Sequence, residues 1–191
     1  DEGRMHPTLD FDLMGAQIEA AHEIGVECPI YITVGWSAND AIWFPDSICR
    51  DREGSRLSTK PMEGKADDEA MPDCCWWHLC PNGSYRDHII ALTREVCEKY
   101  PIDGLFYDIN NVVERCYCPH CLAGMQAEGV DIDDEEAVYA YNMRKWSFLK
   151  EACCDLAKTA NPDATLYWNG KDKYLYHEGT YRFNTHAELE D

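Results

Sequence analysis

Two patterns of hydrophobic and polar positions alternate along the chain and predict different elements. Apolar residues recur at helical spacing over residues 10–24, 85–100 and 133–160, and a Gly or Pro closely follows each segment. We therefore expect three helices over these ranges. At the start of the second helix, we expect Ser84 and Asp87 to form a capping pair.

Short runs of β-branched and aromatic residues lie between these helical segments. Residues 29–36, 102–109 and 165–168 show no alternation of polar and apolar positions. Such runs are typical of strands buried on both faces of a parallel sheet. A short apolar run at 74–79 and a final segment near 181–189 predict two further strands.

The alternation of helix and strand predicts βαβ units and a parallel sheet. Loops after the strands are long, the longest spanning residues 37–73, and a barrel with its chemistry on one face produces this asymmetry. A closed (β/α)₈ barrel needs eight strands and about 250 residues. We therefore predict an α/β fold, with residues 1–191 forming a single partial TIM-barrel catalytic domain. This domain would hold roughly strands two to six of the barrel and would continue beyond both ends.

Composition narrows the class of partner. The chain carries 36 acidic and 17 basic residues, a net charge of −19, which repels nucleic acids and anionic membranes. No apolar run is long enough to span a bilayer. We expect a neutral partner, an oligosaccharide or glycoside, and the composition is also compatible with a homo-oligomer.

The chain contains eleven cysteines, a high and odd number, and most lie singly in apolar stretches, as at Cys28, Cys97, Cys153 and Cys154. Buried free thiols behave as small hydrophobic side chains. A disulfide scaffold would be shorter and less helical. We therefore expect a reduced, cytoplasmic protein.

Three cysteines are different, because Cys116-Tyr-Cys118-Pro-His-Cys121 places their thiols within six residues. Such thiols cannot all pair with one another, but they can converge on one tetrahedral ion. A closed tetrahedral site needs a fourth ligand. His120 lies between two of the cysteines, so it is poorly placed to bind the same ion, whereas Cys80 lies in the preceding strand-to-helix loop. The alternatives to a metal site are an incidental group of free thiols and a redox-active pair. The redox alternative lacks support, because no thioredoxin-like βαβ unit begins next to these cysteines.

The run Cys80-Pro-Asn-Gly-Ser-Tyr-Arg86, taken with this later cluster, resembles the zinc-binding cysteines of family 42 β-galactosidases. In that family one Cys precedes the helix after strand three, and a Cys-x-Cys-x-x-Cys run follows strand four. The resemblance implies a structural Zn²⁺ without an open position for water. Its ligands would be Cys80, Cys116, Cys118 and Cys121.

Asp108 ends the second clear strand, and the carboxyl ends of barrel strands point into the active site. Asp108 is therefore a catalytic candidate, unless it merely caps the following loop. On the final strand, alternation places His186, Glu188 and Glu190 on one face.

The segment from Asp103 to Asn110 is similar to strand four of family 29 and family 151 α-fucosidases and of the hypothetical glycosyl hydrolase 6 family. The final segment resembles the last of these families too. The family 29 resemblance implies that Asp108 is the nucleophile of a retaining hydrolase, with Glu188 or else Glu190 as acid/base. The family 42 resemblance would instead imply that Asp108 is the acid/base, because the nucleophile of that family comes from a later strand.

Aromatic and amide side chains at strand ends suit a sugar site, since aromatic faces stack on sugar rings. The alternative for each aromatic is core packing. The expected substrate-binding residues are Trp36, Trp43, His78, Asn110, Asn111, Trp168, Asn169 and His186.

The leading hypothesis is thus a glycoside hydrolase, α-fucosidase-like or β-galactosidase-like. A non-catalytic carbohydrate-binding barrel with a structural zinc site is the alternative. The two differ in whether a carboxylate from the last strand faces Asp108.

Overall fold

A computed structural model of the chain describes residues 8–59, 75–108 and 113–169. Within these ranges the strands form one parallel sheet with the order β1-β2-β3, so β2 is central. Tyr31 pairs with Phe106 and Phe106 with Tyr167, which sets the register of the whole sheet. The strands are β1 (Ile30–Thr33), β2 (Gly104–Asp108) and β3 (Thr165–Trp168).

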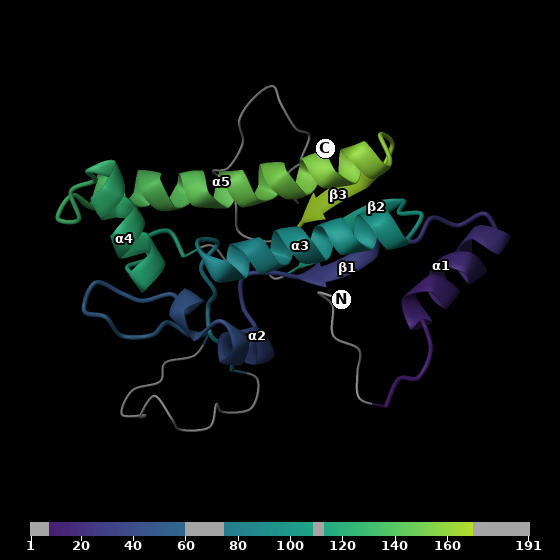
Figure 1. The fold of residues 1–191 in the computed structure, drawn as a ribbon, viewed down its shortest axis with the longest axis horizontal. Coiled ribbons are helices and arrows are strands. Elements are labelled where there is room, and N and C mark those ends of the chain that lie inside the picture. Colours follow the sequence, from purple (N-terminus) through teal and green to yellow (C-terminus); the bar gives the residue numbers. More distant parts are fainter. Residues whose placement is uncertain (1–7, 60–74, 109–112, 170–191) are drawn as a thin grey trace.

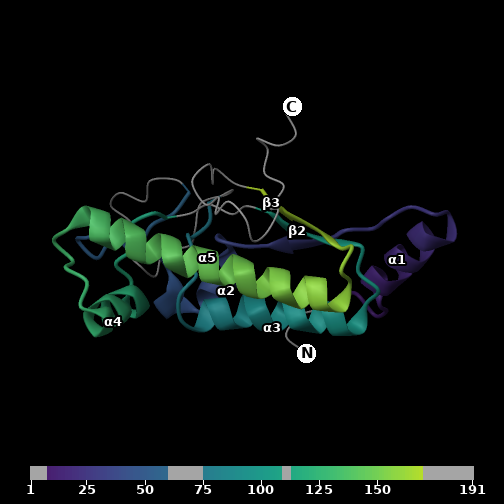
Figure 2. The ribbon, with the colours of Figure 1, turned by 90° about the horizontal axis from the view of Figure 1, so that it is seen from above.

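The helices connect these strands, and the two longest cover one face of the sheet. Figures 1 and 2 show α3 and α5 side by side over that face, with α1 apart at the far end. This arrangement confirms the mixed α/β class and the parallel sheet. The helices are α1 (Leu13–Glu23), α2 (Ala38–Trp43), the 3₁₀-helix η1 (Pro45–Ser47), α3 (Ser84–Lys99), α4 (Pro119–Glu128) and α5 (Glu135–Ala160).

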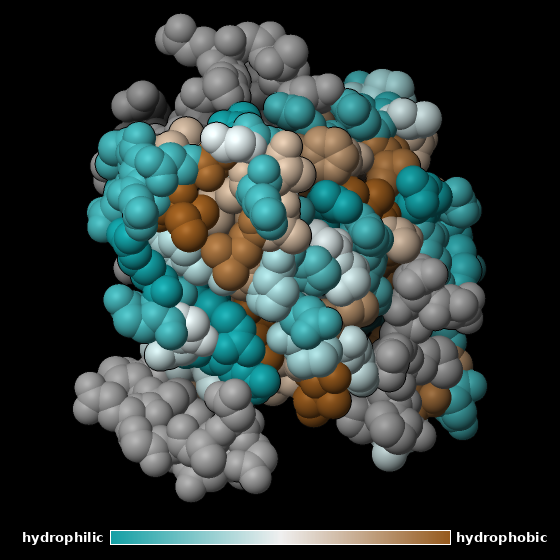
Figure 3. All heavy atoms as spheres, turned by 60° about the vertical axis from the view of Figure 1, so that its left-hand side comes forward, coloured by the Kyte–Doolittle hydropathy of each residue, from teal (hydrophilic) through white to brown (hydrophobic). Residues whose placement is uncertain are grey.

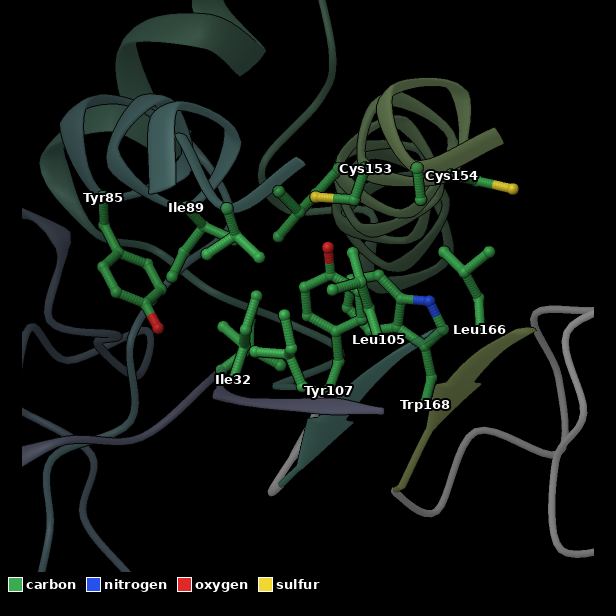
Figure 4. Packing of buried hydrophobic residues seen from close by; sticks show 14 of the residues in the cluster. Ile32, Tyr85, Ile89, Leu105, Tyr107, Cys153, Cys154, Leu166 and Trp168 are labelled. Atoms are coloured by element: carbon green, nitrogen blue, oxygen red, sulfur yellow. The ribbon is translucent and has the colours of Figure 1, made fainter. Parts of the chain in front are cut away.

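The main core lies between the sheet and these two helices (Figure 4). Alternate strand residues, among them Ile32, Tyr107 and Trp168, point at Ile89 of α3 and Cys153 of α5, and all are buried. The rings of Tyr107 and Trp168 stack with centroids 4.1 Å apart. Burying each such side chain contributes about 1.5–3 kcal/mol, so this layer holds the helices on the sheet.

Two local predictions were wrong. Residues 77–79 make only isolated antiparallel bridges with the loop after β1, and β1 pairs directly with β2. The apolar run therefore covers a loop and adds no strand to the parallel sheet. Gly83, with φ at 77°, is the N-cap of α3 without a side-chain cap, so Ser84 and Asp87 form no capping pair. The strand expected near 181–189 lies outside the described residues.

Figure 3 shows hydrophilic side chains over much of one face, with hydrophobic side chains in separate patches. This agrees with the strongly acidic composition. Among the helices that the structure describes, none combines the length and the apolarity that a membrane crossing requires.

Candidate active site and metal centre

The backbone ladder brings the ends of all three strands together around Asp108. The amide of Val34, just after β1, donates to the carbonyl oxygen of Asp108 at 2.9 Å. The amide of Asn169, just after β3, donates to the carbonyl of Tyr107 at 2.8 Å. Asp108 is thus flanked by the continuations of both neighbouring strands, as expected for a residue at the carboxyl edge of a parallel sheet.

Side chains from both neighbours hold the Asp108 carboxylate. The Tyr31 hydroxyl donates to Oδ2 at 2.7 Å, and Nδ2 of Asn169 donates to Oδ1 at 2.6 Å. Burial and the hydrogen bond to Asp108 raise the pKa of Tyr31, so the phenol stays protonated as the donor. Asn169, expected to bind a sugar hydroxyl, contacts the carboxylate instead. Tyr31 was not predicted, although alternation along its strand puts it on the face of Thr33, which pairs with Asp108.

An aromatic row lies on the same face of the sheet, away from α3 and α5. Phe106 of β2 stacks between Tyr31 of β1, with ring centroids 5.8 Å apart, and Tyr167 of β3, at 4.8 Å. Burial, followed by the charge of Asp108, raises the pKa of Tyr167. The carboxylate therefore lies beside a row of aromatic rings contributed by all three strands.

Trp36 and His78, both expected to bind substrate, meet beyond the end of β1. They form a bridge pair, and their rings are nearly parallel, with centroids 6.4 Å apart. The ring of Trp76 packs edge-on against Trp36 at 5.0 Å. Nε1 of Trp36 and Nδ1 of His78 are buried without a hydrogen-bond partner among the described residues. Burial lowers the pKa of His78, which favours a neutral ring that can bind an uncharged ligand.

The other predicted substrate residues fall into three groups. Trp43, at the end of α2, lines a 300 Å³ cavity together with Tyr31 and Thr33. Trp168 is 2% exposed, on the helix-covered face of the sheet, so its prediction as a sugar platform was wrong. Because side chains alternate between the two faces of a strand, Trp168 points into the core. The predictions that lie outside the described residues are Asn110, Asn111, His186, Glu188 and Glu190.

The four predicted metal-binding cysteines do converge. Cys80 precedes α3, Cys116 and Cys118 precede α4, and Cys121 lies in the first turn of α4. All four are buried, and their sulfur atoms lie within 4.8 Å of one another. A tetrahedral ion with metal–sulfur bonds of about 2.3 Å requires sulfur atoms roughly 3.8 Å apart. The thiols therefore fit a closed four-thiolate site with only small adjustments.

The ionisation of the cluster also favours a cation. Hydrogen bonds from neighbouring thiols, first Cys118 and then Cys121, hold the pKa of Cys116 well below its usual range. Hydrogen bonds with Cys116 and other thiols raise the pKa values of Cys80 and Cys121. Buried thiols in such close contact therefore resist ionising together. A divalent ion would allow all four to ionise.

A fifth thiol adjoins this cluster and was not predicted. Cys49 is fully buried in the same group of side chains as Cys80 and Cys116. Burial, ahead of the neighbouring thiols, raises its pKa. Because Cys49 lies in the long loop after β1, no local spacing in the sequence connects it with the other cysteines. His120 does not join the four sulfur ligands, and its ring packs against Gly83.

Comparisons with known proteins agree with this arrangement. The α-L-fucosidase isoenzyme 2 from Paenibacillus thiaminolyticus has a TM-score of 0.72 and 37% identity, over 88% of this chain and 24% of that chain. The β-galactosidase from Rahnella sp. R3 has a TM-score of 0.57 and 14% identity, over 87% of this chain and 29% of that chain. A β-galactosidase from Halorubrum lacusprofundi has a TM-score of 0.54 and 17% identity, over 87% of this chain and 30% of that chain.

The chain thus spans about a quarter of the length of the fucosidase, 24%, and the two galactosidases share only its fold. No curated protein matches the sequence. The model of one protein family, described as hypothetical glycosyl hydrolase 6, matches residues 1–109, which is more than half of the chain. With its parallel sheet, its carboxylate at the end of the central strand and its glycosidase neighbours, the chain belongs to the hypothetical glycosyl hydrolase 6 family.

Proposed function

We propose that this chain carries the nucleophile of a retaining glycoside hydrolase and that this nucleophile is Asp108. The observation that carries the proposal is the position of Asp108 at the carboxyl end of the central strand, with both carboxylate oxygens held by neighbouring strands. Membership of a glycosyl hydrolase family supports the same reaction class. The remaining barrel strands would come from residues beyond those that the structure describes.

In the proposed reaction an Asp108 oxygen attacks the anomeric carbon while the bond to the leaving oxygen breaks. Glu188, or else Glu190, gives its proton to that oxygen. The same carboxylate then takes a proton from water, which attacks the anomeric carbon and releases Asp108. The two carboxyl groups should lie about 5–5.5 Å apart for this double displacement.

An α-L-fucoside is the proposed substrate class, ahead of a β-galactoside. The fucosidase resemblance is much stronger in both identity and superposition than either galactosidase resemblance. A neutral sugar also suits a chain with a net charge of −19. Trp36 and His78 would contact it through their partly exposed rings, which stack on each other beyond the end of β1.

We propose Zn²⁺ as the occupant of the four-cysteine cluster. Its role would be structural, because four thiolates leave no position for water or substrate. Bound there, the ion would join the loop before α3 to the segment between β2 and α4. The described cysteines are all free thiols, which favours a reducing, cytoplasmic compartment.

The test is replacement of Asp108 by Gly in the full-length protein, assayed on 4-nitrophenyl α-L-fucoside and 4-nitrophenyl β-D-galactoside. We expect kcat/KM on the fucoside to fall by at least about 10⁴-fold. Azide should restore turnover and yield a glycosyl azide, because it can occupy the space of the lost carboxylate. Unchanged activity of the variant would remove Asp108 from catalysis. Fucose binding without turnover by the unmodified protein would favour the carbohydrate-binding barrel.

A further inference from the structure

Two side chains hold Asp108 from opposite sides, and each comes from a different strand. Asn169 follows β3 and donates to Oδ1 at 2.6 Å, whereas Tyr31 lies within β1 and donates to Oδ2 at 2.7 Å. Each carboxylate oxygen has two lone pairs. Each oxygen can therefore accept one of these hydrogen bonds without using both of its lone pairs.

We propose that Tyr31 and Asn169 are positioning residues, which fix the orientation of the Asp108 carboxylate for its attack on the sugar. This inference rests on the proposed function, in which Asp108 is the nucleophile. Neither residue needs to touch the substrate. Their effect is transmitted through the hydrogen bonds to Oδ1 and Oδ2.

The length of the tyrosine side chain explains why Tyr31 can serve from within the strand. The residue paired with Asp108 is Thr33, and Tyr31 lies two positions earlier on the same face. Two strand residues span about 7 Å. A phenol can bridge that distance along the sheet surface, whereas a short hydroxyl side chain at the same position cannot.

The aromatic row explains why the Tyr31 ring holds its direction. Tyr31 is 54% exposed, so burial alone does not restrain it. Its ring stacks on Phe106 at an interplanar angle of 20°, and Phe106 stacks on Tyr167 at 15°. These contacts restrict the Tyr31 ring before substrate binds, which lowers the entropic cost of holding the carboxylate.

Both donors also favour the ionised form of Asp108, since hydrogen bonds to a carboxylate lower its pKa. The titratable groups around Asp108 among the described residues include Tyr31 on β1 and Tyr167 on β3. Removing the Tyr31 hydroxyl takes one of the donors away. The acidic limb of the kcat/KM profile should therefore move to higher pH.

The experiment compares Tyr31→Phe, Asn169→Ala and Asp108→Gly in the full-length protein, with 4-nitrophenyl α-L-fucoside as substrate. Tyr100→Phe is the matched control, because the Tyr100 hydroxyl donates to Oδ1 of Asp12 at 3.0 Å, at the opposite end of the sheet. Loss of one hydrogen bond to a charged group corresponds to a roughly ten- to hundredfold fall in kcat. We expect that fall for Tyr31→Phe and Asn169→Ala, with KM nearly unchanged.

Tyr31→Phe should also shift the acidic limb upward, and azide should not rescue it, whereas azide should rescue Asp108→Gly. Wild-type kcat and an unmoved acidic limb in Tyr31→Phe would overturn its positioning role, and wild-type kcat in Asn169→Ala would overturn that of Asn169. Full activity of Asp108→Gly, or its inactivity without azide rescue, would overturn the proposed nucleophile itself. Thermal unfolding of each variant separates a lost fold from a lost hydrogen bond.

Discussion

The sulfur atoms of Cys80 and Cys121 lie 3.3 Å apart, although 41 positions separate the two residues in the chain. This contact joins the loop before α3 to the first turn of α4. Both loops follow strands of the parallel sheet, so their relative position affects the surroundings of Asp108. The cysteine cluster thus joins two connections that leave the same edge of the sheet as Asp108.

Metal removal should destabilise the protein if Zn²⁺ occupies this cluster. A ligand present at about a thousand times its Kd stabilises a fold by about 4 kcal/mol, which corresponds to roughly 10 °C in Tm for a domain of this size. We expect a chelator to lower Tm by about this amount, and added Zn²⁺ to restore it. Cys121→Ser should lose the ion, whereas Cys153→Ser, in the main core, should retain it. Metal analysis that finds no zinc in the unmodified protein would refute the assignment.

Cys49→Ala should weaken the metal site without abolishing it. Cys49 lies in the same buried cluster as Cys116 but does not belong to the four converging sulfur atoms. Loss of such an outer partner typically lowers metal affinity about 10–100-fold. Competition with a chromophoric chelator measures this change, and Cys153→Ala is the matched buried-thiol control. Equal affinities of the two variants would show that Cys49 is only a packing residue.

Gly83→Ala should be unusually destabilising. Gly83 has a φ of 77°, and a Cβ there would lie 2.5 Å from the ring of His120. Gly129→Ala, in the left-handed αL region (φ 68°, ψ 28°) with open space around its Cβ, measures the milder strain of an αL position without a steric clash. That strain costs about 1–2 kcal/mol. Urea unfolding should show a larger loss for Gly83→Ala, together with a lower zinc content, and equal losses would argue against close packing of His120.

Asp103 should stabilise the protein in a pH-dependent manner. The backbone amide of Cys28 and the ring of His22 both donate to Oδ2 of Asp103. These hydrogen bonds, the one from Cys28 first, lower the pKa of Asp103. A lowered pKa stabilises the fold above the unfolded value of about 3.9, and this stabilisation is lost as pH falls through the folded value.

Asp103→Ala should therefore lower the urea midpoint at pH 7, and its difference from wild type should shrink below about pH 4. Asp163→Ala, at an exposed aspartate, is the control. Metal loss at low pH affects every variant alike, so the difference between variants remains interpretable. A difference that is constant with pH would exclude this ionic contribution.

The periodic segments of this chain could be predicted from the sequence, because their signals are local. Apolar spacing located α1, α3 and α5 to within a few residues, and unalternated β-branched runs located all three strands of the described sheet. The three cysteines between 116 and 121 are also close in sequence. Their convergence on Cys80 was predicted through family resemblance, and the sulfur positions confirm it.

Local signals failed where tertiary contacts decide. The apolar residues near Trp77 resemble a strand, yet they bridge the loop after β1 because β2 already occupies the neighbouring position in the sheet. Trp168 and Asn169 are adjacent in sequence but lie on opposite faces, since strand alternation sends one into the core and the other to Asp108.

The sequence by itself determined which segments become helices and strands, and which residue types are available for acid and thiol chemistry. Only the tertiary structure decided which of them meet. Tyr31 reaches Asp108, and Cys49 reaches Cys116, across 77 and 67 positions of chain. Contacts at such separations depend on strand register and on how the loops fold back, and no local pattern of residues encodes them.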